Sequence, residues 1–240
     1  MLKNKGVYMV KKRVDGREMN ELRPIKITPS VVERADGSAY LEWGQNKMIV
    51  AVYGPKELLP KHLANSQRGK INFIYRMAPF SVPERKNPKP GRRDIEISKV
   101  VGEALSYAVL LEEFPGMVID VYVQILDSNA GTRVAALTAA SVALADAGIP
   151  MKDLVTAVAV GKANGNIIAD LNKNEEDADD AVDMAFAMLP GSEEIVLLQA
   201  DGILSEDEFD KAIKIAKEKC QEVRKLQIEA LKSKFKALKE

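Results

Sequence analysis

The first third of the chain alternates apolar and polar positions with the two-residue period of β-strands. From Ile25 to about Leu59, β-branched and aromatic runs are interrupted by Gly37 and Gly44. This pattern predicts an antiparallel meander of strands joined by short turns. The segment KINFIYRM at residues 70–77 repeats the alternation and predicts a further strand.

The period then changes to that of an amphipathic helix. After the Pro- and Lys-rich loop 83–91, apolar side chains recur at helical spacing over residues 92–113, and a proline beyond them marks the expected end. Residues 118–126 predict another strand. Residues 132–147 are rich in alanine and stop at Gly148, which is typical of a buried helix.

The last third predicts a hairpin, two strands and a long helix. The dipeptide Asn164-Gly165 favours a hairpin turn. The expected elements, in chain order, lie at residues 154–160, 166–171, 183–189, 194–199 and 205–237. The whole order of elements predicts an α+β fold in which helices pack on a mixed sheet. We expect residues 1–24 to form an N-terminal arm, residues 25–204 a single core, and residues 205–240 a terminal helix packed on the same domain.

Composition narrows the class of protein. Cys220 is the only cysteine, so no disulfide and no cysteine-based zinc site can form within one chain. No apolar run has the length of a signal-peptide core or of a membrane span. We therefore expect a soluble, cytoplasmic protein without a membrane partner. The 35 basic and 35 acidic residues cancel, so any attraction to nucleic acid must come from a local patch.

Charge is strongly segregated along the chain. Residues 84–93 carry five basic side chains and one acidic, whereas residues 170–183 carry seven acidic side chains and one basic. Arginine forks suit RNA phosphates, and clustered carboxylates suit a hard cation such as Mg²⁺. Each segment alone is more often a solvated surface. A basic segment and an acidic segment in one chain favour phosphoryl transfer on RNA, because that chemistry needs cations for the RNA phosphates and carboxylates for a metal ion.

The junction before the alanine-rich helix is a candidate phosphate site. Free backbone N–H groups at a helix N-terminus attract anions, and Gly131 lets a ligand approach the backbone closely. The Thr132 hydroxyl can donate a hydrogen bond, and Arg133 supplies positive charge. The alternative is an ordinary helix start capped by Thr132 or Asn129.

Asp177 and Asp183 are the candidate carboxylate pair. Six extended residues span roughly 20 Å, which is too far for the two side chains to share one ion. On one continuous helix they would not share a face either. The pair can cooperate only if residues 178–182 fold back as a turn, and an acidic surface turn remains the simpler interpretation of the spacing.

Motifs along nearly the whole chain resemble the ribonuclease PH family, and within it the catalytic ring subunits of archaeal exosomes. The matching segments are Arg13-Val14-Asp15-Gly16-Arg17, Arg23-Pro24-Ile25, Ala51-Val52-Tyr53-Gly54-Pro55, Met77-Ala78-Pro79-Phe80-Ser81, Gly91-Arg92-Arg93-Asp94-Ile95-Glu96-Ile97-Ser98-Lys99, Gly131-Thr132-Arg133-Val134-Ala135-Ala136-Leu137, Ala145-Asp146-Ala147-Gly148-Ile149-Pro150-Met151, and Glu176-Asp177 to Asp183-Met184. So many motifs in one order make the resemblance specific.

The resemblance implies a fold like the second domain of ribosomal protein S5 and a 3′–5′ exoribonuclease that uses inorganic phosphate. It implies a hetero-hexameric ring with a non-catalytic, ribonuclease PH-like subunit, RNA-binding cap subunits and RNA in a central channel. It assigns phosphate binding to Ala130, Gly131, Thr132 and Arg133, and RNA binding to Arg92, Arg93, Arg76 and His62. Catalysis falls to Asp177, Asp183 and Arg133, with Asp177 as the acid, and Mg²⁺ or Mn²⁺ to Asp177 and Asp183.

The chain departs from the family pattern at three places. Asp127-Ser128-Asn129 stands where Gln-Ala-Asp is usual, and Gly44-Gln45-Asn46 lacks the usual threonine. The acidic loop carries an extra residue near Asn174, and Asp179-Asp180 replaces Tyr-Gly. Two alternatives stay open: a homohexameric ribonuclease PH that trims transfer-RNA 3′ ends, and a non-catalytic subunit that binds RNA.

Overall fold

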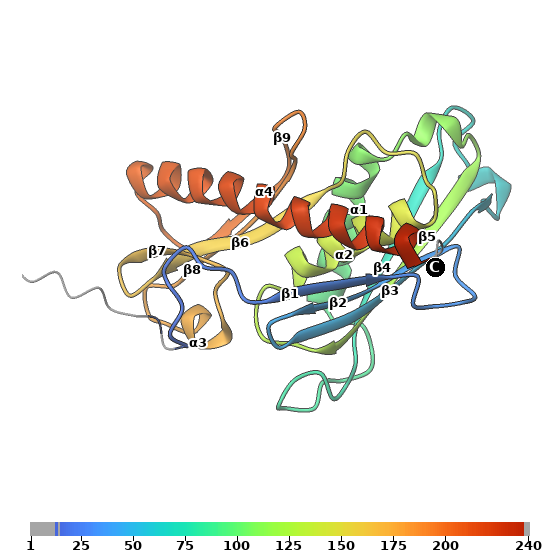
Figure 1. Cartoon of the computed structure of the whole chain (residues 1–240). Helices are drawn as coiled ribbons and strands as arrows, with labels where there is room; N and C mark the ends of the chain where they lie inside the picture. The colour runs from blue at the N-terminus through green and yellow to red at the C-terminus, as the bar shows by residue number, and fades with distance from the viewer. Residues whose placement is uncertain (1–12, 14, 238–240) are drawn as a thin grey trace, which may run out of the picture.

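The computed structural model describes residue 13 and residues 15–237, and it contains two β-sheets joined by helices (Figure 1). The first sheet has the order β1-β2-β3-β5-β4. Its strands are β1 (Ile25–Pro29), β2 (Gly37–Trp43), β3 (Asn46–Glu57), β4 (Lys70–Met77) and β5 (Met117–Asp127). The predicted meander is confirmed, since β1, β2 and β3 pair in antiparallel order.

The parallel pairing of β4 with β5 requires a crossover, which the first long helix provides. This helix, α1 (Arg92–Ala108), is followed by a short 3₁₀ helix, η2 (Leu111–Glu113). Another 3₁₀ helix, η1 (Lys61–Leu63), lies between β3 and β4.

The second sheet has the order β7-β6-β8-β9 and is antiparallel throughout. Its strands are β6 (Thr156–Ala163), β7 (Asn166–Ala169), β8 (Val182–Leu189) and β9 (Glu194–Asp201). The connections are α2 (Thr132–Asp146), which leads from the first sheet to β6, and α3 (Lys173–Glu176), which lies between β7 and β8. The predicted hairpin at Asn164-Gly165 is confirmed as the turn between β6 and β7.

Two helices hold the sheets together. Twelve of the fifteen residues of α2 are buried, as its alanine content predicts. The long helix α4 (Glu206–Ala237) runs across both sheets and contacts β6 and β7 on one side and β1 on the other (Figure 1). Ser205 caps it, since its hydroxyl accepts a hydrogen bond from the Glu208 backbone N–H at 3.3 Å. Cys220 is buried in this helix, as expected for a packing residue.

The sequence analysis placed the end of one helix wrongly and missed another helix. The helix expected over residues 92–113 ends at Ala108, because Val109 leaves it in an extended conformation and forms a β-bridge with Met151. Tertiary pairing therefore ends the helix before the proline does. The short helix α3 was not expected at all, and its N-cap is Asn172, whose side chain accepts from the Glu175 backbone N–H.

The described part of the N-terminal arm is held against the second sheet. Arg13 is buried, and its guanidinium forms an ion pair with Glu175 at 2.6 Å. Residues 1–12 and 14, which belong to the same expected arm, lie outside the described residues. Within the described residues, no helix is long and apolar enough to span a bilayer.

Candidate active site

The candidate phosphate loop, residues 128–133, joins β5 to the buried helix α2. Ala130 and Gly131 both have left-handed backbone conformations, with φ of 56° and 67°. Gly131 adopts this conformation without strain and serves as the N-cap of α2. No side chain of the described residues caps the helix, and its first backbone bond is from Ala135 N–H to Gly131. The N–H groups of the first turn are therefore open to an anion.

Side chains from β2–β3 and the arm fix this loop from behind. Asn46 Nδ2 donates to the Ala130 carbonyl at 2.6 Å, and the Asn129 N–H donates to Asn46 Oδ1 at 2.5 Å. The Arg23 guanidinium donates to the carbonyls of Asn129 and Ala130. The carbonyls of Asn129 and Ala130 are therefore bound by side chains of distant segments. Arg23 and Asn46 were not among the predicted site residues, although Arg23 lies in a matching motif.

A fully buried carboxylate orients Arg23. Asp170 Oδ2 accepts from the Arg23 Nε at 2.9 Å and from the Trp43 indole at 3.0 Å, while Oδ1 accepts from Arg23 Nη2 at 2.6 Å. The acidic loop therefore contributes to the phosphate loop through a structural ion pair, rather than through a metal.

Two of the departures from the family pattern act together. The Asn129 side-chain amide donates to the Gln45 side-chain carbonyl, and Asn129 Oδ1 accepts from the Lys173 backbone N–H at 2.9 Å. Asn129 therefore ties the phosphate loop to the turn before β3 and to the first residue of α3. The sequence could not show this role, because the three segments are far apart along the chain.

Arg133 lies at the start of α2 with its side chain 20% exposed. Its Nη2 is 3.2 Å from Glu96 Oε2 on α1, and Glu96 also accepts from Gln199 on β9. Arg133 Nε is buried and has no hydrogen-bond partner among the described residues. Thr132 is also buried, and its hydroxyl accepts from Tyr75 at 2.9 Å, which leaves its own proton available for donation.

The predicted RNA-binding residues fall into two groups. Arg92 and Arg93 are exposed in the first turn of α1, and Arg93 is close enough to influence Asp183. Arg76 is half-buried near the end of β4, opposite Gln124 of β5. His62 is exposed in η1, on the connection between β3 and β4. This connection lies at the far end of the first sheet from the loop that precedes α1 (Figure 1).

The loop before α1 is anchored by a buried acidic residue. Asp94 accepts from Lys86 Nζ and from the Gly91 N–H, both at 2.7 Å. Lys86 is therefore occupied within the fold, and Asp94 offsets the unfavourable position of two arginines at a helix N-terminus.

The acidic loop places its carboxylates in different surroundings. Asp183, the second residue of β8, is largely buried, and burial raises its pKa, although the charges of Arg133 and Arg93 oppose the rise. Asp177 is 61% exposed and forms an ion pair with Lys173 at 2.6 Å. The segment between them does turn back, with an Ala181 N–H to Ala178 hydrogen bond.

Glu176, which was not predicted as a site residue, shares the surroundings of Asp183. Burial raises the pKa of Glu176, and the charge of Asp183 raises it further. Lys173, Arg93 and the Gly131 backbone N–H lower the pKa of the same carboxyl group. Glu176 and Asp183 therefore share the electrostatic influence of each other and of Arg93.

The predicted metal pair, Asp177 and Asp183, stays a prediction, whereas other carboxylates of the acidic loop have partners within the fold. Asp170 and Glu175 are bound by arginines, and Asp180 accepts from the N–H groups of the β6–β7 turn. No group of three or more His, Cys, Asp or Glu side chains in the described part of the chain could hold a metal ion. Four of the seven acidic residues, Asp170, Glu175, Asp177 and Asp180, thus have separate partners within the fold.

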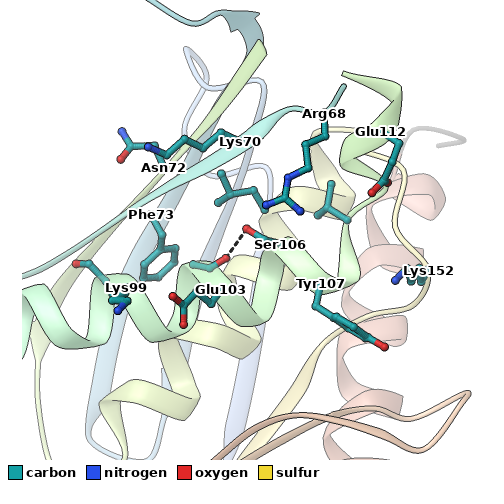
Figure 2. A pocket seen from close by; sticks show the side chains of 14 residues that line it. Arg68, Lys70, Asn72, Phe73, Lys99, Glu103, Ser106, Tyr107, Glu112 and Lys152 are labelled. Atoms are coloured by element: carbon teal, nitrogen blue, oxygen red, sulfur yellow. Dashed lines mark hydrogen bonds between the residues drawn. The ribbon is translucent and has the colours of Figure 1, made fainter. Parts of the chain in front are cut away.

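A separate groove of about 630 Å³ lies between β4 and α1 (Figure 2). Arg68, Lys99 and Glu103 line it, and Lys152 stands 4.2 Å from the centre of the Tyr107 ring. None of the predicted site residues lines this groove. It is therefore distinct from the phosphate loop.

Comparison with known proteins shows which family the chain is similar to. Residues 21–150 match the model of the 3′ exoribonuclease family, domain 1, and residues 153–219 match domain 2 of the same family. The chain is 54% identical over 224 residues to the exosome complex component Rrp41 of Thermococcus kodakarensis, covering 93% of this chain and 90% of that protein. It is 52% identical over 238 residues to Rrp41 of Pyrococcus furiosus, covering 98% and 95%.

Solved structures have the same fold. Rice Rrp46 aligns with a TM-score of 0.81 at 25% identity, over 91% of this chain and 100% of that one. An Archaeoglobus fulgidus exosome chain, from a structure with RNA bound to the active site, aligns with a TM-score of 0.77 at 24% identity, over 90% and 92%. The expected α+β fold of ribonuclease PH type is confirmed. The chain belongs to the ribonuclease PH family of 3′ exoribonucleases.

Proposed function

We propose that this chain is the catalytic ring subunit of an exosome that degrades RNA from its 3′ end with inorganic phosphate, releasing nucleoside diphosphates. The observation that carries the proposal is the open N-terminus of α2 beside Arg133, whose buried Nε has no partner among the described residues. Relatives that span more than nine-tenths of the chain are exosome complex components. The reverse reaction, which adds nucleotides from diphosphates, uses the same groups.

Phosphate needs no activating base, because it is already anionic and nucleophilic. The task of the protein is to hold it in line with the scissile bond and to offset its repulsion from RNA. The N–H groups of Gly131 and Thr132, the Thr132 hydroxyl and the Arg133 guanidinium supply these interactions at one helix terminus. The buried surroundings strengthen each of them relative to bulk water.

RNA is held by its backbone. Arg92 and Arg93 project from the start of α1 beside the phosphate loop and bind the last phosphates of the strand without regard to sequence. Arg76 extends this basic surface along β4. His62 is too far along the sheet to contact the same nucleotide, so in this proposal it contacts RNA upstream of the 3′ end.

The departing 3′ oxygen needs a proton, which a carboxyl group near the phosphate must supply. Asp183 is under the electrostatic influence of Arg133 and Arg93 and, with them, sets the charge around the transferring phosphorus. A divalent cation, Mg²⁺ or Mn²⁺, stays an expectation drawn from the family. Asp177 and Asp183 are the residues that would hold it, and in this structure Asp177 forms an ion pair with Lys173.

The assembly is part of the proposal. A ring component of an RNA-degrading complex requires neighbours, and we propose a hetero-hexamer with a non-catalytic, ribonuclease PH-like subunit, topped by RNA-binding cap subunits. A cytoplasmic location is proposed from the single cysteine, which suits a reducing compartment.

The test is to incubate the chain, with and without the partner subunit, with RNA and inorganic phosphate. Nucleoside diphosphates support phosphorolysis, whereas nucleoside monophosphates indicate hydrolysis and overturn the proposal. Activity of the chain alone would favour the homohexameric trimming enzyme, and no product in either case would favour a non-catalytic subunit.

Arg133→Gln sharpens this test. The variant removes the charge and the fork, so the KM for phosphate should rise at least about tenfold, which corresponds to about 1.4 kcal/mol. Arg34→Gln is the matched control, since Arg34 is exposed and makes no ion pair with the described residues. An unchanged KM in Arg133→Gln would contradict the assigned phosphate site.

A further inference from the structure

The backbone and the side chain of Asn129 make hydrogen bonds to different parts of the chain. The backbone is held with the phosphate loop: its N–H donates to Asn46 Oδ1 at 2.5 Å, and its carbonyl accepts from the Arg23 guanidinium. The side chain extends to other segments, since its amide group donates to the Gln45 side-chain carbonyl and its Oδ1 accepts from the Lys173 backbone N–H at 2.9 Å. The side chain can therefore be altered without releasing the backbone of the phosphate loop.

The contact with Lys173 is continued by hydrogen bonds within α3. The helix is closed at its start by Asn172, whose Oδ1 accepts from the Glu175 N–H and whose own N–H donates to Glu175 Oε2 at 2.9 Å. At its end, the Asp177 N–H donates to the Lys173 carbonyl at 3.1 Å. Two successive hydrogen bonds, one to the N–H and one to the carbonyl of Lys173, thus connect Asn129 to the backbone of Asp177.

We propose that Asn129 is a positioning residue: its side-chain oxygen holds α3, and with it the acidic loop that carries Asp177, at a fixed distance from the phosphate loop. The inference rests on the proposed function, in which the phosphate held by Gly131, Thr132 and Arg133 must meet the RNA end beside the acidic loop. Asn129 acts on the reaction through this placement, without touching the reacting atoms. Placement matters because a displacement of about 1 Å can slow catalysis about 100-fold.

Gln45 keeps the Asn129 amide in the orientation that this role requires. An asparagine side chain has a donor end and an acceptor end, and only the acceptor end can bind the Lys173 N–H. Because the donor end is bound by Gln45 Oε1, the oxygen is directed at α3. Aspartate, the residue that is usual here in the family, has an oxygen at both ends and would still accept from Lys173. Position 129 therefore needs an acceptor rather than a charge.

Two substitutions of Asn129 in the assembled ring test the role of its side chain. Asn129→Leu keeps the size but removes the acceptor, and we expect kcat for diphosphate release to fall at least about tenfold. The KM for phosphate should stay within about threefold, because Gly131, Thr132 and Arg133 are unchanged. Asn129→Asp restores the acceptor, and the Gln45 amide can rotate to donate to the second oxygen. This variant should therefore recover kcat to within about threefold of the unaltered ring.

The N–H of Lys173 can be removed without altering the phosphate loop. Lys173 is the first residue of α3, where proline is well tolerated, and the extended Asn172 before it, with φ of −91° and ψ of 173°, suits a following proline. Lys173→Pro should lower kcat at least about tenfold relative to Lys173→Ala. The alanine variant is the matched control, since it loses the same ion pair with Asp177 but keeps the N–H. Adding Lys173→Pro to Asn129→Leu should lower kcat little further, because both changes break one contact.

The urea midpoint, followed by the fluorescence of Trp43, shows whether each variant is folded, and the two Lys173 variants decide the question if Asn129→Leu is not. The role of Asn129 is overturned if folded Asn129→Leu keeps its kcat, if Lys173→Pro is as fast as Lys173→Ala, if Asn129→Asp is as slow as Asn129→Leu, or if the losses of the combined variant multiply. A higher KM for phosphate with an unchanged kcat would also overturn it, since Asn129 would then act on phosphate binding. If the unaltered ring with phosphate releases no nucleoside diphosphate from RNA, the proposed function itself fails.

Discussion

Replacing Asp170 by asparagine tests whether the buried ion pair behind the phosphate loop supports the fold. Asp170 is completely buried and has a left-handed backbone, with φ of 54°. Asparagine tolerates this conformation and has nearly the same shape. The substitution therefore removes the charge while leaving the backbone and the packing almost unchanged.

The magnitude follows from the donors around the carboxylate. Arg23 N–H, Arg23 Nε and Trp43 Nε1 all donate to Oδ2, while Arg23 Nη2 donates to Oδ1. An asparagine must point its NH₂ group at one of these two positions, where donor would meet donor. Since it also leaves the Arg23 charge buried without its partner, we expect a loss of about 3–5 kcal/mol in the free energy of unfolding.

Trp43 provides the assay. It is the only tryptophan of the chain, it is buried, and it donates to Asp170 itself, so its fluorescence reports unfolding of this region. Urea titration of the purified protein gives the free energy of unfolding by linear extrapolation. Asp179→Asn serves as the exposed control and should change stability by less than about 0.5 kcal/mol.

The same substitution should weaken phosphate binding, because Arg23 holds the carbonyls of Asn129 and Ala130. We expect the KM for phosphate to rise more than the KM for RNA. A loss of stability below about 1 kcal/mol would refute the reasoning, since it would mean that the Arg23 charge finds water or another acceptor when Asp170 is neutral.

Three further predictions concern charge. Burial alone would raise the pKa of Asp146, but hydrogen bonds from Lys234, the Ser38 N–H and the Ser30 hydroxyl hold this pKa below its usual value. The ionised Asp146 therefore stabilises the folded protein at any pH above the pKa that Asp146 has in the unfolded chain. This stabilisation is lost as the pH falls through the lower pKa of the folded protein. Asp146→Ala should therefore cost about 2 kcal/mol at neutral pH, and its urea midpoint should converge with that of the unaltered protein in acid. The pKa of Asp183 is higher in the folded protein than in the unfolded chain. The contribution of Asp183 to the free energy of unfolding therefore decreases as the pH rises from the unfolded-state pKa to the folded-state pKa. Asp183→Asn should consequently raise the melting temperature at neutral pH while phosphorolysis is lost, and a lower melting temperature would contradict this. Arg92→Ala combined with Arg93→Ala should reduce the slope of log affinity against log salt for single-stranded RNA by about 1.4, and an unchanged slope would exclude both residues from the RNA backbone.

Local pattern was sufficient for most of the secondary structure. The two-residue alternation at residues 70–77 matches β4 residue for residue, and the alanine-rich segment matches α2 to within one residue. The strand succeeds because the apolar period decides which side chains can be buried together, and the helix because a run of small apolar residues favours burial on all sides. The end of α1 could not be predicted this way, since Val109 leaves the helix to pair with Met151, more than forty residues later.

The candidate site also has parts that local sequence could indicate and parts that it could not. The candidate phosphate loop could be proposed from the sequence because a glycine, a hydroxyl and an arginine at a helix start are local features with a local physical meaning. Arg23 and Asn46 act on that loop from distant parts of the chain, so their roles had no signal beyond the motif that contains Arg23. The Asn129 contacts to Gln45 and Lys173 even join two positions that depart from the family pattern.

The sequence by itself therefore determined most of the elements, the family and the candidate anion-binding helix terminus, because each depends on residues that are neighbours or lie at a fixed period. Only the tertiary structure decided how each acidic side chain at α3 is buried. Glu175, Glu176 and Asp177 are all acidic neighbours, and yet Glu175 is buried against an arginine, Glu176 is largely buried and Asp177 faces solvent. Their different burial follows from how α3 is held against Asn129, which no local pattern specifies.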